Sequence, residues 1–337
     1  MPAAVRLLRR PVVAGGVAVC ALAVVVVLSL RIGALQISSS DLVQAIFAYS
    51  GDSYEQRVVR ELRVPRTIIG LVVGSALAVS GAMMQAITRN PLAGPSILGV
   101  NSGAALAIVV ALVLGGLDHP LQYLWFAFAG GGAAAMAVYA LGSVGPGGAS
   151  AEKLALAGVI VSLLLTSWLT ALMLLDRQAL DVVRFWMAGS LSGRDLGVIV
   201  ALLPVVLVGL IGSLLLGNAL NVVALGEDTA RALGMRLGAV RIVTMLLAVL
   251  TAASAVAIAG PIGFVGLAVP HIARSLVGPD YRRIVRLCVV LGPVALLAAD
   301  ISGRVAAYPS EIQVGIVTSL VGAPVLIVLA RRRTVAL

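Results

Sequence analysis

The sequence carries little charge and few cysteines. Asp, Glu, Lys and Arg make up 11% of its 337 residues, whereas soluble domains contain roughly 25%. Hydrophobic residues make up 61% and the mean hydropathy is +1.10, so the apolar excess extends over the whole chain. These values exclude an ordinary soluble protein. The two cysteines, Cys20 and Cys288, lie in apolar runs, where they form no disulfide framework and, alone, no metal site.

The sequence also lacks the short motifs that carry enzyme chemistry. It contains no GxxxxGK[ST] phosphate loop, HExxH, GxSxG or CxxC. The two histidines, His119 and His271, are isolated from other metal ligands, and a structural role is favoured for His271, which follows Pro270 at a predicted helix break. We therefore expect no catalytic residue, no metal site and no bound cofactor in this chain. Any energy that it uses must come from a source outside this chain.

Long apolar runs dominate what is present. About 20 apolar residues span the hydrocarbon core as a helix. The runs are continuous, whereas a transmembrane β-barrel needs alternating segments of roughly ten residues. We predict an all-α polytopic membrane protein that forms a single domain over residues 1–337. The ten expected spans are 12–33, 66–86, 96–115, 121–142, 154–175, 196–216, 241–259, 262–276, 285–302 and 312–330.

The basic residues predict the orientation of these spans. With ten spans, both termini lie on one side, and that side collects fifteen of the 24 Lys and Arg residues. By the positive-inside rule the termini are cytoplasmic, in a multi-pass protein of the cytoplasmic membrane. The net charge of +10 is explained by this bias, and we expect no nucleic-acid binding. The basic, apolar N-terminus resembles a signal peptide, but no convincing cleavage site follows it, so it is interpreted as the retained first span.

Two stretches interrupt the apolar pattern with Gly, Pro and polar residues. The first is "RNPLAGPSILGVNSGA" (89–104) and the second is "GPIGFVGLAVPHIAR" (260–274). Interrupted segments in both halves of a chain are typical of a transport pathway built from repeats. Non-helical backbone at membrane depth is tolerated only where protein buries it or water reaches it. Tight packing at a helix start is the alternative for each stretch.

Small residues recur at four-residue intervals in the second expected span. Gly70, Gly74, Ala78 and Ala82 share one helix face, and such a face allows another helix to approach closely. The partner helix can belong to this chain or to a second subunit.

A long connection, 220–241, has moderate polarity and is expected in the cytoplasm. Its apolar positions predict one or two short helices, broken at Gly226 and Gly234. Glu227 and Asp228 lie near a helix start, where negative charge is favourable. Such a helix can lie on lipid or dock into the groove of a partner protein, and its acidic residues favour the protein partner.

Arginines are more frequent on the outer side than the positive-inside rule predicts. Arg63 and Arg66 begin the second span, and Arg304 lies near the outer end of the ninth. Snorkelling to the interface and contact with an acidic partner are both open explanations. Asp300 can pair with Arg304 at i,i+4. An ionisable residue within a span is a functional candidate, so an ion-coupled secondary transporter that uses Asp300 is the alternative function.

Five blocks of this chain resemble one family. They are "RVPRTIIGLVVGSALAVSGAMMQAITRNPLAGPSILGVNSGA", "RFWMAGSL", "ALNVVALGEDTARALG", "GPIGFVGLAVPHIAR" and "LLAADISGRVAAYPSEIQVGIVTSLVGAPVLI". In this order they resemble the permeases of the iron-siderophore and vitamin B12 class of ABC importers (FecCD-type), and within that class the ferric-enterobactin permeases most. The resemblance covers residues 57–333.

The resemblance implies a type II ABC importer permease fold of ten helices with cytoplasmic coupling helices. It implies a second permease subunit, either a second copy or a related chain. Two cytoplasmic ATPase subunits would bind ATP, and an extracytoplasmic binding protein would deliver a ferric siderophore. Haem and cobalamin travel through similar permeases, so the cargo is the least specific part of this expectation.

Residue roles are implied in the same way. Arg63, Arg66 and Arg304 match positions that pair with glutamates of the binding protein. The segment 220–237 matches the helices that couple to the ATPase. The implied cytoplasmic gate lies at the turn after the second span and at the start of the fifth. The residues assigned to coupling are Leu225, Gly226, Glu227, Asp228, Ala230, Leu233 and Gly234, and those assigned to the path and its gate are Asn90, Leu92, Gly99, Asn101, Ala151 and Glu152.

Overall fold

The protein is helical throughout the part that the computed structural model describes, residues 11–334 apart from 34, 36, 52, 118, 146–149 and 195. Arg6, Arg9 and Arg10, part of the predicted basic terminus, lie outside these residues. The helices are α2 (Pro11–Arg31), α3 (Ser39–Phe47), α4 (Tyr54–Arg57), the π-helical η1 (Val58–Arg63), α5 (Val64–Thr88), the 3₁₀ turn η2 (Pro95–Leu98), α6 (Val100–Val113), α7 (Pro120–Gly142), α8 (Ala151–Leu175), α9 (Arg177–Met187), α10 (Leu196–Leu215), α11 (Gly217–Ala224), α12 (Glu227–Ala232), α13 (Leu237–Ala259), α14 (Val265–Val277), α15 (Tyr281–Ala306) and α16 (Val314–Thr334).

The ten predicted spans correspond to ten apolar helices. Seven are long and apolar enough to cross a membrane, and α6, α14 and the apolar part of α16 are shorter. The second span is longer than expected, because a continuous helical segment covers Tyr54–Thr88. The third begins at Val100 instead of residue 96, because Pro95–Leu98 forms a 3₁₀ turn and Gly99 then adopts a left-handed φ of 72°.

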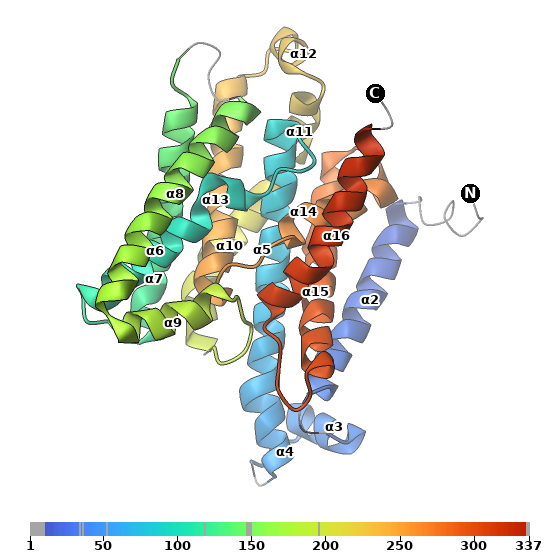
Figure 1. Ribbon diagram of the computed structural model, residues 1–337. Coiled ribbons are helices and arrows are strands. Elements are labelled where there is room, and N and C mark those ends of the chain that lie inside the picture. Colours follow the sequence, from blue (N-terminus) through green and yellow to red (C-terminus); the bar gives the residue numbers. More distant parts are fainter. Residues whose placement is uncertain are drawn as a thin grey trace.

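Helix α5 lies at the centre of the molecule (Figure 1), and nearly all of it is buried. Its small residues explain this position. A Cβ added to Gly74 would lie 2.6 Å from the Pro293 nitrogen of α15, and one added to Gly81 would lie 1.6 Å from the Gly266 carbonyl oxygen of α14. The small-residue face is therefore an intrachain packing surface.

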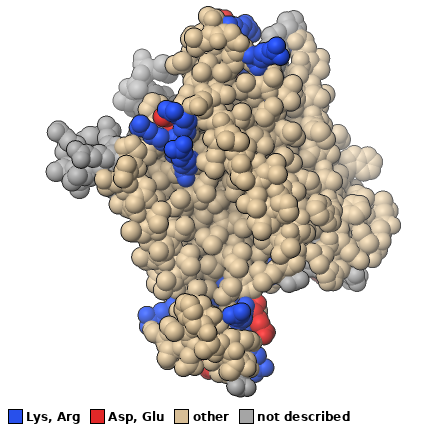
Figure 2. Space-filling view, turned by 180° about the vertical axis from the view of Figure 1, so that it is seen from behind, with Lys and Arg blue, Asp and Glu red and all other residues tan. Residues whose placement is uncertain are grey.

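Large apolar side chains cover much of the outer surface. Leu156, Ile160, Leu163 and Leu164 of α8 are exposed, and the apolar part of α2 is only 17% buried. A helix that is apolar on its outward side is typical of a membrane span. The space-filling view shows the same broad uncharged surface between two charged ends (Figure 2).

The two ends of the molecule differ. At one end lie α12, the first described turn of α2 and the last turn of α16, and at the other lie α3, α4 and α9 (Figure 1). We call these the α12 end and the α3 end. Helix α3 and η1 enclose a small separate cluster of Ile37, Ala45 and Val59.

Candidate functional site

An arginine cluster lies at the α3 end, where η1 continues into α5. Pro65 lies in the first turn of α5, directly after the π-helical turn, and its missing N–H interrupts the regular helical hydrogen bonds there. The π-helical turn before it ends at Arg63, and π-turns are frequent at functional sites. This local geometry directs Arg63 toward α2 and Arg66 toward α15.

Two arginines of this cluster cap the C-terminal end of α2. Arg63 donates hydrogen bonds from Nη1 to the carbonyl oxygens of Leu30 (2.9 Å) and Arg31 (2.6 Å). Arg304 donates from Nη1 to the carbonyl oxygens of Ser29 and Ile32, both at 2.8 Å. The last carbonyls of a helix lack intrahelical partners, and cations are favoured there. These two side chains therefore complete α2.

Asp300 binds both Arg66 and Arg304 and so links α5 to α15 within the cluster. It is fully buried, and its carboxylate accepts hydrogen bonds from Arg66 Nη2 at 2.8 Å and from Arg304 Nε at 3.0 Å. Arg66 also donates from Nη1 to Glu311 at 2.6 Å, and the Glu311 side chain is 34% exposed. The cluster thus holds three guanidinium groups against two carboxylates, of which Glu311 is the more exposed.

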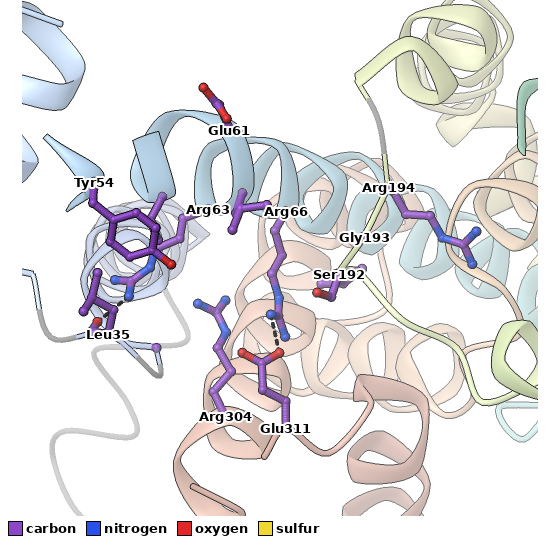
Figure 3. A pocket seen from close by; sticks show the side chains of 14 residues that line it. Leu35, Tyr54, Glu61, Arg63, Arg66, Ser192, Gly193, Arg194, Arg304 and Glu311 are labelled. Carbon is purple, nitrogen blue, oxygen red and sulfur yellow. Dashed lines mark hydrogen bonds and ion pairs between the residues drawn. The ribbon is translucent and has the colours of Figure 1, made fainter. Parts of the chain in front are cut away.

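A pocket of about 500 Å³ opens beside these residues. Arg66, Arg304 and Glu311 converge on it, while Arg194 enters its lining from the opposite wall and points away (Figure 3). Burial lowers the pKa of Arg194, and the nearby Tyr123 opposes that effect. The lining is rich in arginine and suits an anionic partner.

Arg63, Arg66 and Arg304 are all at least 90% buried and bonded within the chain. Their role in docking the binding protein stays a prediction. Buried charges need partners, and α2, α5 and α15 supply them. The predicted pairing of Asp300 with Arg304 is confirmed. Sequence analysis missed Glu311, which is distant from Arg66 along the chain.

The two interrupted stretches meet at one cavity of about 250 Å³. Leu92 and Asn101 line it from the first stretch, and Phe264 and Gly266 from the second. Phe264 has a φ of 66°, which is unusual for a bulky residue. The chain therefore brings together two irregular segments far apart in sequence.

The remaining predicted path residues lie around this cavity or away from it. Asn90 forms a turn, in which its side-chain oxygen accepts a hydrogen bond from the Leu92 N–H at 2.9 Å. Gly99 is buried against α7 and α8, and its left-handed φ favours glycine. Ala151 and Glu152 begin α8 as predicted, and Glu152 does not line the cavity.

The connection at the α12 end has the predicted short helices. Helix α11 ends at Ala224, Gly226 and Gly234 have positive φ, and α12 lies between them. Ala230 is buried with Val223 and Leu237, so α12 packs against the end of α11 and the start of α13.

Two leucines of this connection face outward. Leu225 and Leu233 are 66% and 64% exposed, and Asp228 is exposed beside them. Leu225, Gly226 and Asp228 share a hollow with Arg89, which ends α5 with a φ of 48°. The first interrupted stretch and this connection therefore meet at the α12 end.

Comparison with known proteins gives consistent results. The FecCD transport family matches residues 21–332. The chain is 44% identical to the ferric enterobactin transport system permease protein FepD of Escherichia coli over 308 residues, 91% of each chain. It is 41% identical to the Fe(3+)-citrate import system permease protein YfmD of Bacillus subtilis over 305 residues, 90% of each. An inward-facing metal-chelate type ABC transporter superposes with a TM-score of 0.80 and 29% identity, covering 94% of this chain and 97% of the other.

Proposed function

Because the chain belongs to the FecCD transport family and is the membrane permease of an ABC importer, we propose that it carries a ferric siderophore across the cytoplasmic membrane. The observation that supports this proposal is that the two ends of the molecule carry different surfaces, with a cavity between them. An arginine-rich pocket lies at the α3 end, exposed leucines lie at the α12 end, and a cavity between two interrupted helices lies between them.

The α3 end is proposed to face outward and receive the binding protein. A glutamate of that protein would meet the arginine pocket, where Arg66 already holds one partly exposed carboxylate, that of Glu311. Because Arg63 and Arg304 are occupied by α2, their part in docking would be to set the positive field of the pocket and to position Arg66. Direct contact would fall to Arg66 and to the pocket rim.

The α12 end is proposed to face the cytoplasm and to bind the ATPase subunits. Leu225 and Leu233 present apolar surface beyond the packed Ala230, and exposed leucines of a short helix fit a groove on a partner. Arg89 adjoins the same hollow, so a movement of this connection reaches the interrupted stretch directly. Coupling of this kind requires contacts that differ between two states.

The siderophore is the proposed cargo because the relatives named above are an enterobactin and an iron-citrate permease. The partner permease is either a second copy of this chain or a related one. The ion-coupled alternative loses its support, because Asp300 is bound by two arginines instead of standing free in a path.

Reconstitution of the chain with its ATPase and binding protein in vesicles tests this function. We expect uptake of a ferric siderophore that requires ATP. The double variant Leu225→Ser with Leu233→Ser should reduce ATP-driven uptake about tenfold or more, because a coupling contact worth about 1.4 kcal/mol is lost. Its thermal stability should stay unchanged, because both side chains are exposed.

Uptake by the chain alone without nucleotide would contradict the proposal. Growth of a deletion strain under iron limitation, supplied with single siderophores, identifies the cargo. If the deletion strain kept wild-type growth on every siderophore but lost uptake of haem or cobalamin, the siderophore assignment would be replaced while the importer would stand.

A further inference from the structure

Helix α15 begins with three arginines on one face. Arg282 and Arg283 are about half exposed, and Arg286 is exposed one turn further on. Positions three and four apart are neighbours on a helix, so the three guanidinium groups share one surface. Tyr281, on the other side of the helix, is buried with its hydroxyl 2.5 Å from Arg274.

One carboxylate lies beside these arginines. Asp280 accepts a hydrogen bond from Asn221 at 2.7 Å and pairs with Arg282 at 3.3 Å and with Arg283 at 3.5 Å. Arg286 has no ion pair among the described residues. The group therefore carries a net positive charge of two after Asp280 is counted.

The arginines stand at the end of an apolar stripe. Continuing from Arg286 in steps of four residues, the partly or fully exposed positions are Val290, Val294 and Ala298. No charged residue of α15 between Arg286 and Arg304 is exposed, because Asp300 is fully buried. The same face of one helix is thus basic at its start and apolar along its length.

The three arginines at the start of α15 lie at the expected depth of the lipid headgroups. Helix α15 has 26 residues and is about 39 Å long, which exceeds a hydrocarbon core of about 30 Å. Its first turn therefore lies at the level of the headgroups when its middle lies in the hydrocarbon core. Figure 2 shows basic side chains around an acidic one on the lateral surface, apart from those at the tip and with uncharged surface below.

We propose that Arg282, Arg283 and Arg286 form a binding site for an anionic phospholipid of the inner leaflet. The phosphate would lie against the guanidinium groups, and the acyl chains would follow Val290, Val294 and Ala298. Arginine binds phosphate oxygens through paired N–H donors, and basic sites on the cytoplasmic side of membrane helices attract anionic lipids. Asn221 joins this group to the start of the connection 220–241, whereas Leu225 and Leu233, proposed to bind the ATPase, lie further along that connection.

The test uses the purified full chain in detergent with equal amounts of phosphatidylglycerol and phosphatidylcholine of matched acyl chains. Intact-complex mass spectrometry measures the ratio of the two lipids retained. The wild type should retain phosphatidylglycerol preferentially. Arg283→Gln with Arg286→Gln should reduce that preference about tenfold, and the same positions changed to Lys should restore most of it.

Arg89→Gln with Arg231→Gln is the matched control, since it removes the same charge at the same end, where α5 is nearly all buried and α12 is a short polar helix. The control should keep the wild-type lipid ratio. Inorganic phosphate should fail to displace the lipid, because it has no acyl chains to contact the apolar stripe. If the double variant loses stability, Arg286→Gln alone carries the test, because Arg286 forms no ion pair with any residue that the structure describes.

Three outcomes would overturn the proposal. The first is an unchanged lipid ratio in the variants, and the second is an equal loss in the control. The third is displacement by phosphate alone, which would leave a simple anion site. An unchanged ratio with loss of a co-purifying ATPase would assign the surface to a protein contact.

Discussion

Asp300 shows what a single buried carboxylate does in this chain. It has no exposed surface and holds Arg66 and Arg304 together, and these in turn reach Glu311 and the end of α2. Removing one partner of a buried pair leaves an uncompensated charge, which costs more than the pair itself contributes.

We therefore expect Asp300→Asn to destabilise the chain by about 3 kcal/mol or more, measured as thermal unfolding in detergent. The control is Glu311→Gln, which removes a partly exposed carboxylate from the same arginine and should cost about 1 kcal/mol or less. Equal effects of the two variants would contradict the central position of Asp300.

The position of Glu311 leads to a prediction about binding of the delivering protein. If it occupies the position of a docking carboxylate on Arg66, Glu311→Gln should strengthen binding of the delivering protein severalfold, about 1 kcal/mol in free energy. The gain should diminish at high salt, which screens charges that remain partly exposed. Titration of the binding protein against the assembled importer measures it, and weaker binding would instead make Glu311 part of the docking surface.

At the scale of helices, close backbone contacts fix the positions of α5, α14 and α15. The Gly81 Cα faces the Gly266 carbonyl of α14 so closely that no side chain fits. Overpacking of a tight interface costs about 1–3 kcal/mol, and here the obstacle is backbone, which cannot rotate away.

Gly81→Ala should therefore lower stability by at least about 2 kcal/mol. Gly132 of α7 offers a matched control, because an added Cβ there meets nothing within 4 Å. Gly132→Ala should be neutral or stabilising by up to about 1 kcal/mol. Thermal unfolding of both variants measures the difference, and similar curves would refute the packing explanation.

The sequence predicted the helices better than their side-chain contacts. The lengths of the apolar runs predicted the ten spans, because a helix that faces lipid needs only enough consecutive apolar residues. Gly226 and Gly234 predicted the breaks around α12. The contacts of Arg66 with Asp300 and Glu311 were not predicted, because these partners lie more than 200 positions away along the chain. The crosswise helices α3 and α9 were missed, because short segments of mixed polarity carry a weak periodic signal.

For the whole molecule, the proposed orientation gives a direct test. Ser310, between α15 and α16, and Thr229 of α12 are exposed at opposite ends. In a cysteine-free background, a membrane-impermeant maleimide should label Ser310→Cys in intact cells. It should label Thr229→Cys only after the membrane is opened. The reverse pattern would invert the orientation and with it both proposed partner surfaces.

The capping of α2 by Arg63 and Arg304 has a consequence for membrane insertion during synthesis. The first span leaves the ribosome with its final carbonyls unpaired, and Arg63 follows after only some thirty residues. Arg304 is synthesised 275 residues after Ser29, whose carbonyl it caps, and is already accompanied by Asp300 four positions earlier. Helix α2 is thus completed by a helix synthesised much later, so a chain truncated before α15 would reach the membrane with α2 incompletely anchored.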